Sequence, residues 1–293
     1  MKRTVLFLVC FLAFGAIPLL AADPPVCISC HDEVVATMSA SPHMNARRVP
    51  AGHATGCEGC HGSGAKHAAE GDPSLIRNPE QALDWNAVCL ECHTKKLGEW
   101  ATSRHQAEDV ACTECHTVHK PGRKATAACN GCHQDVTARM QMPSRHPLRE
   151  GAMTCASCHD VHSNNEAALK TKQRVNDLCY SCHQAQEGPF IFEHQPVQED
   201  CRACHDPHGT PTDKLLIANE PALCLQCHDF HFHASYTAST TPLEFGGQTR
   251  ISPYGAQSFN VGFTTKCTQC HSRIHGTDLP SNGLTHGGRG LTR

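Results

Sequence analysis

The sequence is poor in the residues that build an ordinary protein core. Aromatic residues make up 5% of its 293 residues, and the 39% hydrophobic share includes 21 cysteines. Structure-breaking residues are common, with 22 glycines and 18 prolines. A chain of this composition would normally be loop-rich or only marginally stable. It therefore needs a source of apolar surface other than its own side chains.

Long hydrophobic runs are also missing, apart from one at the amino terminus. Lys2 and Arg3 precede an apolar stretch over residues 5–20, and small residues follow it. This order is typical of a secretory signal peptide, and the run is too short for a good membrane anchor. We expect residues 1–22 to be removed on export to a bacterial periplasm, leaving 23–293 as the mature domain.

What the sequence does contain is one motif repeated ten times. In Cys-x-x-Cys-His, each thiol can add to one vinyl group of the same haem, and the histidine is then placed to ligate the iron. The attachment cysteines are Cys27, Cys30, Cys57, Cys60, Cys89, Cys92, Cys112, Cys115, Cys129, Cys132, Cys155, Cys158, Cys179, Cys182, Cys201, Cys204, Cys224, Cys227, Cys267 and Cys270. The proximal histidines are His31, His61, His93, His116, His133, His159, His183, His205, His228 and His271.

Other uses of paired cysteines do not fit the count. The ten motifs use 20 of the 21 cysteines, and the remaining Cys10 lies in the leader. Structural zinc pairs, redox dithiols and disulfides need no histidine directly after the second cysteine. We therefore predict ten covalently bound haem c groups. Their rings would supply the missing core, so that the chain should not fold without them.

Histidine is abundant even after the motifs are counted. The motifs account for ten of the 23 histidines, which leaves 23 minus 10, or 13. Ten of these alternate with the motifs, which predicts a second, distal imidazole for every iron. The pairing stays open, although a histidine three residues after its own motif is expected to reach a neighbouring haem. The predicted distal ligands are His43, His67, His105, His119, His146, His162, His194, His208, His233 and His275.

Three histidines lie outside this alternation. His231 competes with His233 for one place, whereas His53 and His286 are expected at the surface. A methionine can also serve as a distal ligand, and Met44 is the one candidate.

The alternation divides the mature chain into five two-haem repeats followed by a flexible tail from residue 276. We expect a fold that is mostly loop with short α-helices, an elongated molecule whose stacked haems form the core. In a linear array each repeat contacts mainly its neighbours. The repeats cover approximately residues 27–67, 89–119, 129–162, 179–208 and 224–275.

Regular secondary structure is expected only in short pieces. Helical turns are predicted over Asp32–Met38, Ala82–Cys92 and Glu166–Thr171. A polar cap at Asn176 is predicted to begin a helix before a motif. Residues 234–265, which lack histidine and cysteine, are expected to form a loop or a weak hairpin.

Two histidines on every iron would close both axial positions. That arrangement suits electron transfer and leaves no open site for a substrate, so we expect no enzymatic activity. A multihaem reductase is the enzymatic alternative, but such enzymes keep one open haem, in some cases on Cys-x-x-Cys-Lys, which does not occur here. The formal charge of −3 omits the haem propionates. The loaded protein would be more acidic, which disfavours nucleic acid as a partner.

Several stretches resemble the decahaem c-type cytochromes of outer-membrane porin–cytochrome complexes, the MtrA, DmsE and PioA type. The resemblance covers nearly the whole mature chain and is strongest from Ser144 onward. A family pattern of histidine followed by Ala-Ser favours His233 over His231 as a ligand. The matching stretches are Ser144–Leu148, Met153–Cys155, Glu193–Val197, Cys204–Gly209, Leu223–His228 and Cys270–Gly276.

The resemblance implies a haem wire that threads through a large outer-membrane β-barrel porin. Such a wire would exchange electrons with a periplasmic or inner-membrane donor cytochrome and with an extracellular cytochrome or reductase, in either direction. The departures are a short region before Cys27, the doubled His231 and His233, and the additional His53. A soluble periplasmic electron shuttle with the same haems and no barrel is the alternative interpretation.

Overall fold

The computed structural model describes most of the mature chain. The predicted signal peptide, His231, His233, His286 and most of the predicted tail lie outside the described residues. The described residues are 26–45, 47–120, 125–171, 173–228, 242–245, 248–250, 266–279 and 291.

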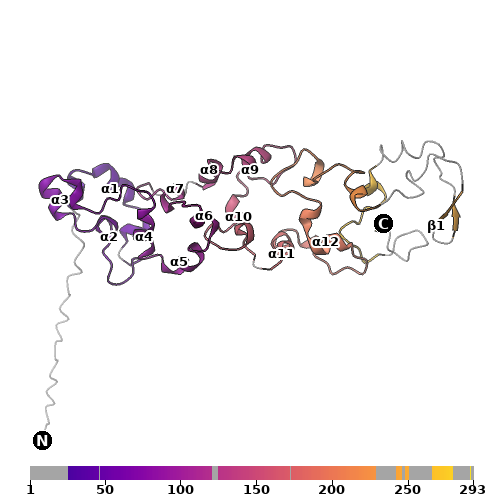
Figure 1. Cartoon of the computed structure of the whole chain (residues 1–293), viewed down its shortest axis with the longest axis horizontal. Helices are drawn as coiled ribbons and strands as arrows, with labels where there is room; N and C mark the ends of the chain where they lie inside the picture. The colour runs from indigo at the N-terminus through magenta and orange to yellow at the C-terminus, as the bar shows by residue number, and fades with distance from the viewer. Residues whose placement is uncertain are drawn as a thin grey trace, which may run out of the picture. The chain divides into compact units, whose positions relative to one another are not determined.

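The described chain is mostly loop, punctuated by short helices, as the composition predicts (Figure 1). None of its α-helices exceeds seven residues. The α-helices are α1 (Asp32–Met38), α2 (Cys57–His61), α3 (Ala65–Glu70), α4 (Asp84–Leu90), α5 (Thr94–Trp100), α6 (Arg104–Ala107), α7 (Cys112–Cys115), α8 (Ala125–Asn130), α9 (Gln134–Arg139), α10 (Cys155–Cys158), α11 (Val175–Tyr180) and α12 (Gln195–Glu199).

Short 3₁₀ turns supply most of the remaining regular structure. They are η1 (Val26–Ser29), η2 (Pro42–Met44), η3 (Pro73–Leu75), η4 (Glu166–Ala168), η5 (Gln184–Gln186), η6 (Cys201–Ala203), η7 (Asp213–Leu215), η8 (Cys224–Gln226) and η10 (Cys267–Gln269). Every helix among the described residues is too short or too polar to span a lipid bilayer.

The attachment motifs explain why the helices occur where they do. Each motif forms or ends one helical turn, and in nine of them the histidine N–H donates to the carbonyl of the first cysteine at 2.8–3.1 Å. Residues at positions i, i+3 and i+4 lie on one face of a helical turn. The two thiols and the imidazole of a motif are therefore directed to the same side.

One predicted helix is confirmed in full and another in its central part. Helix α1 has the predicted bounds, and α4 lies inside the predicted Ala82–Cys92. Strands β1 (Leu243–Phe245) and β2 (Gln248–Arg250) pair antiparallel, with Leu243 opposite Arg250. This confirms the hairpin expected within residues 234–265.

Two local predictions were only partly right, because each segment contains a short helical element but not in the predicted form. Residues Glu166–Thr171 were expected to form a helical turn, but only η4 forms, and Ala167 and Ala168 have φ of 49° and 53°. Asn176 was expected to cap a helix, but α11 begins before it, and Asp177 accepts the N–H of Arg174 at 3.2 Å. Both segments are shaped by contacts to other motifs, which are described below.

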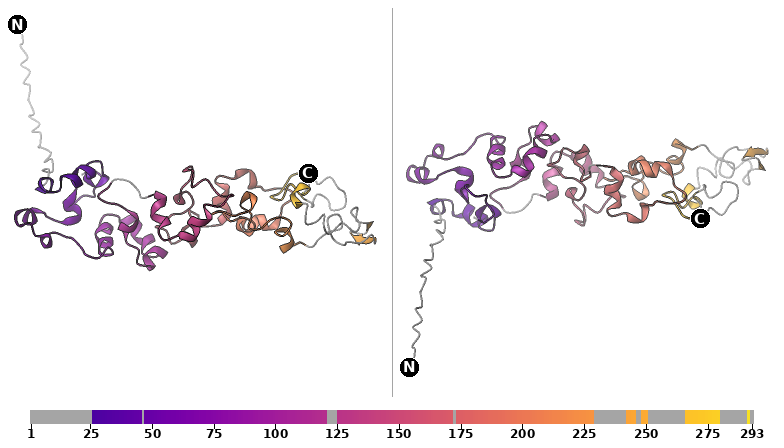
Figure 2. Two further views of the ribbon diagram at one scale, coloured as in Figure 1. Left: turned by 90° about the horizontal axis from the view of Figure 1, so that it is seen from above. Right: turned by 90° about the horizontal axis from the view of Figure 1, so that it is seen from below.

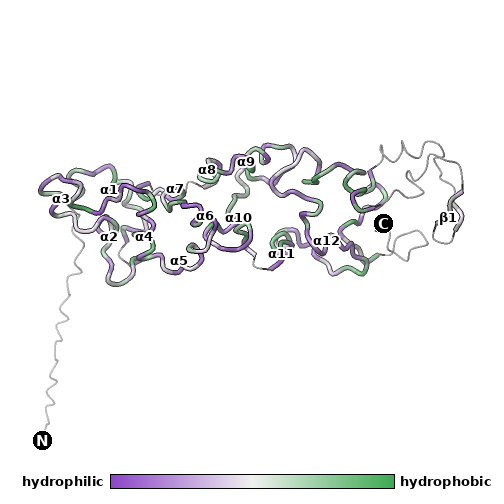
Figure 3. Tube along the Cα trace, in the orientation of Figure 1, coloured by the Kyte–Doolittle hydropathy of each residue, from purple (hydrophilic) through white to green (hydrophobic). Residues whose placement is uncertain are grey.

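Apolar side chains form no continuous core in the described residues. Hydrophobic and hydrophilic positions alternate along the chain (Figure 3). The most buried side chains are polar, since Asn176 is 0% and Ser103 is 1% exposed. The buried apolar residues are Met38, Trp100, Ala111, Met140, Tyr180, Val197 and Leu291. This scarcity leaves the interior to be completed by another apolar component.

The described residues form two compact units. The first contains residues up to Asp84 together with 117–120, and the second contains 85–116 and the described residues from 125 onward. Within the second unit, the colour changes from magenta around α5 to α8 to orange around α12 along the length of the unit (Figures 1 and 2).

Candidate haem-binding site

The structure brings the first cysteines of the two motifs in each predicted repeat next to each other. These thiols are close enough to alter each other's pKa. The five pairs are Cys27 with Cys57, Cys89 with Cys112, Cys129 with Cys155, Cys179 with Cys201, and Cys224 with Cys267. The twenty motif cysteines form no disulfides with one another. The neighbouring Cys89 and Cys179 thiols lower the pKa of Cys112 and of Cys201 to about 7, which favours the reactive thiolate.

A second set of contacts between cysteines joins consecutive repeats of the second unit. Burial, followed by neighbouring thiols, raises the pKa of Cys129, Cys158 and Cys204. The neighbours that contribute to these shifts include Cys115, beside Cys129, and Cys227, beside Cys204. The attachment points thus form a continuous row along this unit, rather than ten separate sites.

The histidines are arranged in pairs, each with one motif histidine and one histidine from outside the motifs. Eight pairs are described, and their ring centroids are 5.9–6.3 Å apart. They are His31–His67, His61–His119, His133–His105, His116–His162, His183–His146, His159–His208, His228–His194 and His205–His275. Four predicted ligands are not among these pairs. His43, His93 and His271 lie in the described part of the chain and each has an interaction partner, whereas His233 lies outside the described residues.

This spacing matches an iron atom held between two imidazoles. An imidazole nitrogen binds a first-row metal at about 2 Å, and the nitrogen lies roughly 1 Å from its ring centre, which gives a separation of about 6 Å between centroids. Six of the eight pairs are close to parallel, with interplanar angles of 11–22°. His105 and His133 are almost perpendicular, at 89°. The residues present therefore fit haem groups with two axial histidines.

Hydrogen bonds at the other ring nitrogen support the same arrangement. Several Nδ1 atoms lie against backbone carbonyls, so that Nδ1–H donates and the Nε2 lone pair stays available for a metal. Examples are His61 with the Arg77 carbonyl at 2.9 Å and His146 with the Pro207 carbonyl at 2.8 Å. The other carbonyl bonds are His67 to Asp72 at 2.9 Å, His105 to Val161 at 3.3 Å, His159 to Ala167 at 2.9 Å and His205 to Lys214 at 2.8 Å.

The bond between His159 and Ala167 explains why residues 166–171 do not form the predicted helical turn, and the bond between His205 and Lys214 shows the same structure in a second loop. The backbone turns at Ala167 so that its carbonyl faces His159 Nδ1, and at Lys214 so that its carbonyl faces His205 Nδ1. Each turn has two successive residues with positive φ, including 58° at Lys214. The two loops therefore have the same local structure, in which a left-handed backbone orients the motif histidine.

Carboxylates orient two further histidines. Asp160 Oδ1 lies 3.6 Å from His162 Nδ1, and Asp206 Oδ1 lies 3.7 Å from His208 Nδ1. Asp206 also accepts the N–H of His208 and a bond from Arg139, at 3.0 and 2.8 Å. We had not identified these aspartates from the sequence, although the shared spacing Cys-His-Asp-x-His was a signal that could have shown them.

Four of the described histidines outside the motifs favour the neutral form that binds metal. Burial lowers the pKa of His119, His194, His208 and His275. The Trp100 ring lies edge-on against His162, with centroids 6.0 Å apart. Its Nε1 is a buried donor with no partner among the described residues, which suits an acidic group of a bound haem. His53 is exposed, as predicted.

Most of the described histidine pairs join two different repeats. Only His31–His67, of the eight, lies inside a single predicted repeat. His119 is three residues from His116 in the sequence but pairs with His61, and His162 pairs with His116. This geometry agrees with the expectation that such histidines reach a neighbouring site.

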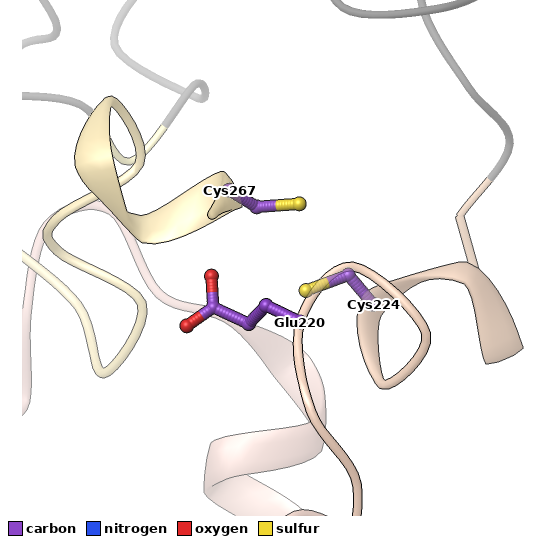
Figure 4. A group of neighbouring side chains, drawn as sticks. All are labelled: Glu220, Cys224 and Cys267. Atoms are coloured by element: carbon purple, nitrogen blue, oxygen red, sulfur yellow. The ribbon is translucent and has the colours of Figure 1, made fainter. Parts of the chain in front are cut away.

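Among the described residues, one group outside the histidine pairs has the spacing of a metal site. Glu220, Cys224 and Cys267 place their ligand atoms within 4.8 Å of one another (Figure 4). The Glu220 carboxylate already accepts the N–H and the hydroxyl of Thr268, at 2.8 and 2.9 Å. Both thiols belong to haem-attachment motifs, so the group belongs to the haem site and forms no separate metal centre.

Comparison with known proteins agrees with this chemistry. The family described as "Doubled CXXCH motif" matches residues 146–188 and 194–232, and "Cytochrome c-type protein NrfB-like" matches residues 57–126. "Multiheme cytochrome MtrA" of Shewanella baltica is 35% identical over 240 residues, which is 78% of this chain and 69% of the relative. The chain belongs to the MtrA family of multihaem cytochromes.

More distant relatives are also named as c-type cytochromes. "C-type polyheme cytochrome OmcC" of Geobacter sulfurreducens is 24% identical over 76% of this chain, which corresponds to 31% of its own length. "Cytochrome c-type protein NrfB" of Haemophilus influenzae is 22% identical over half of this chain and 65% of its own length. This MtrA-family chain is thus an electron-transfer multihaem cytochrome that carries covalently bound haem c.

Proposed function

We propose that this chain binds ten haems, each attached by one motif and ligated by two histidines, and carries electrons across the outer membrane inside a β-barrel porin. The supporting observation is the spacing of 5.9–6.3 Å between the rings of eight histidine pairs. The same geometry supports the proposal that His119 serves the haem of His61 and His162 the haem of His116.

The chain's own residues would keep each iron suited to rapid electron transfer. Bound haem supplies a one-electron change between ferric and ferrous iron. Two imidazoles would hold each iron, and the bonds from Nδ1 to carbonyls, such as His61 to Arg77, would keep the imidazole orientation fixed. Little reorganisation is then needed at each transfer.

The row of attachment cysteines supports transfer along the chain. Paired first cysteines, such as Cys129 and Cys155, would hold the edges of two rings together within a repeat. The contacts of Cys129 with Cys115 and of Cys204 with Cys227 would bring rings of successive repeats together. Electron tunnelling falls steeply with distance, so closely spaced rings give a continuous path.

The porin is the most specific part of the proposal. It rests on the membership of the MtrA family and on a chain poor in apolar surface. Barrels with many strands have polar lumens that can hold a plug. The partners would be a donor cytochrome on the periplasmic side and an extracellular cytochrome or reductase on the other.

A soluble periplasmic shuttle is the second candidate. The match of residues 57–126 to the NrfB-like family favours it. The shuttle would use the same haems without a barrel. A multihaem reductase fits less well, because the paired histidines leave no axial position for a substrate.

Co-purification separates these functions. Outer membranes of the native host would be solubilised in mild detergent, and a C-terminally tagged chain isolated with its haem-staining partners. A stoichiometric β-barrel protein is the expected result. Recovery of the chain from the soluble periplasm without a barrel would overturn the porin proposal and support the shuttle. A high-spin haem in the wild-type protein would instead support the reductase.

A further inference from the structure

Asn176 is the most deeply buried side chain among the described residues, and it joins two haem motifs. It stands three residues before Cys179, in α11, and is 0% exposed. Its Nδ2 donates to the carbonyls of Val197 and Gln198, at 2.8 and 3.3 Å. Its Oδ1 accepts the N–H of Cys201 at 2.8 Å. A buried amide is costly unless hydrogen-bonded, so this one stabilises a single arrangement.

The same contact occurs in the second repeat. Asn86 also stands three residues before the first cysteine of a motif, Cys89. Its Oδ1 accepts the N–H of Cys112 at 2.7 Å. In both repeats, an asparagine that precedes one motif therefore holds the backbone of the first cysteine in the other.

The fifth repeat has an equivalent contact made by a different side chain. Glu220 precedes Cys224 by four residues, and its carboxylate accepts both the N–H and the hydroxyl of Thr268, which follows Cys267 (Figure 4). The carboxylate and the two thiols lie within 4.8 Å of one another. Three repeats thus fix their paired first cysteines through a side chain placed before the first motif.

Helix capping alone does not account for these contacts. The first N–H groups of a helix need acceptors, and a neighbouring side chain usually provides one. Asp200 already does so for Arg202 N–H at the start of η6. Asn176 reaches the same turn from another helix, where Cys179 lies against Cys201. Its position determines how two attachment points are placed relative to each other.

We propose that Asn86, Asn176 and Glu220 are positioning residues that set the separation and tilt of the two haems in their repeats, and hence the rate of electron exchange between them. This inference rests on the proposed haem attachment. Each haem is bonded to its first cysteine, so a ring moves when the backbone of that cysteine moves. Loss of one of these three side chains should change the electronic coupling between the two haems of its repeat and leave the haem ligands intact.

The test compares Asn176→Leu with Asn176→Asp and with a matched control. Leucine has a similar volume but no hydrogen bonds, whereas aspartate keeps the acceptor for the N–H of Cys201. The control, Asn164→Leu, makes the same change at an exposed asparagine. Haem content by intact mass, exciton splitting in the Soret circular dichroism and the rate of internal electron equilibration after a laser-triggered electron injection are measured for each.

The expected result is full haem content in all three variants. Asn176→Leu should lose part of the exciton splitting and equilibrate more slowly, Asn176→Asp should lose less, and Asn164→Leu should match the wild type. Unchanged splitting and rate in a fully loaded Asn176→Leu would overturn the proposal.

A second variant covers the case in which the buried position does not tolerate leucine. Glu220 is only half-buried, and Glu220→Ala removes its two bonds to Thr268. It should show the same reduced splitting with full haem content. A haem deficit in both variants would show that these side chains act in attachment, which would also overturn the positioning role. The proposed function fails separately, if the wild-type protein lacks the bis-histidine low-spin spectrum.

Discussion

At the scale of single residues, the haem site depends on what lies behind each imidazole. Backbone carbonyls face Nδ1 of six described histidines, such as His61, but a charged group faces His208. Asp206 Oδ1 lies 3.7 Å from its Nδ1, and the other carboxylate oxygen accepts a bond from Arg139 at 2.8 Å. A carboxylate at this position raises the basicity of a metal-binding histidine. It should therefore favour the ferric state of the haem bound by His208.

The variant Asp206→Asn should raise the midpoint potential of one haem. Loss of the charge makes His208 a weaker donor, and a tenfold loss in the preference for ferric iron corresponds to about 60 mV for one electron. Spectroelectrochemical titration of the whole protein would show one haem shifted upward. Asp213→Asn is the control, since that side chain is 85% exposed and, among the described residues, forms an ion pair with Lys266. A uniform shift of all haems, or none, would contradict this role.

At the scale of elements, a glycine allows the loop after His208 to approach α9. Gly209 has φ of 143°, and a Cβ at this position would lie 2.2 Å from the carbonyl oxygen of Arg139. The glycine is therefore required by a close contact between two backbones. The neighbouring bridge between Ser144 and Thr210 stabilises the same crossing.

The variant Gly209→Ala should destabilise the protein by about 1–3 kcal/mol, the usual cost of overpacking. Thermal melting followed by Soret circular dichroism would detect a lower midpoint. Gly98→Ala is the control, because Gly98 lies in α5 with open space around it. Alanine there should be neutral or slightly stabilising. Equal midpoints for the two variants would contradict the close contact.

The pairing of histidines between repeats can be tested at the same scale. His162→Ala should produce one high-spin haem, because it removes the distal ligand that the structure places against His116. Combining it with Cys112→Ala and Cys115→Ala removes the haem of that motif. The high-spin signal in the electron paramagnetic resonance spectrum should then disappear.

Persistence of the signal in the triple variant would show that His162 serves another haem. His53→Ala provides the matched control, since His53 is exposed and outside the predicted set. It should leave every haem low-spin.

The sequence predicted what is local and left open what depends on tertiary structure. The motif itself dictates the helical turns and the direction of its thiols and imidazole, and α1 was predicted with its observed bounds. Pairing was not predictable, because His119 is near His116 in the chain but lies against His61 in space. Helix-forming residues at 166–170 were overridden, since the Ala167 carbonyl must face His159. The sequence around Asn176 suggests a helix cap, and its actual hydrogen-bond partners, which lie 21 or more residues away, could not be predicted.

At the scale of the whole molecule, we expect that the protein carries too little apolar surface to fold without haem. Few apolar side chains among the described residues are buried, and the deepest positions hold Asn176 and Ser103. The haem rings would have to supply the interior.

A chain produced in the cytoplasm without haem attachment should therefore be unfolded. Far-ultraviolet circular dichroism should show little helix, and limited proteolysis should digest the chain rapidly, whereas the haem-loaded protein resists. The control is the same chain exported with its haem-attachment machinery. A protease-resistant, helical haem-free chain would contradict this dependence.

The pairing between repeats also bears on how such a chain can change in length. On the proposed assignment, the third repeat supplies His146 and His162 as distal ligands to haems of its two neighbours. Its own two haems receive His105 and His208 from those neighbours. Deleting this repeat would leave two motif histidines and two histidines outside the motifs without partners, and these four could pair with one another. Inserting a copy of the repeat would likewise leave no histidine unpaired. Interior repeats therefore exchange histidines with their neighbours by the same rule, so that their number can change without breaking the pattern. The first repeat, where His31 meets its own His67, is the boundary that ends the series.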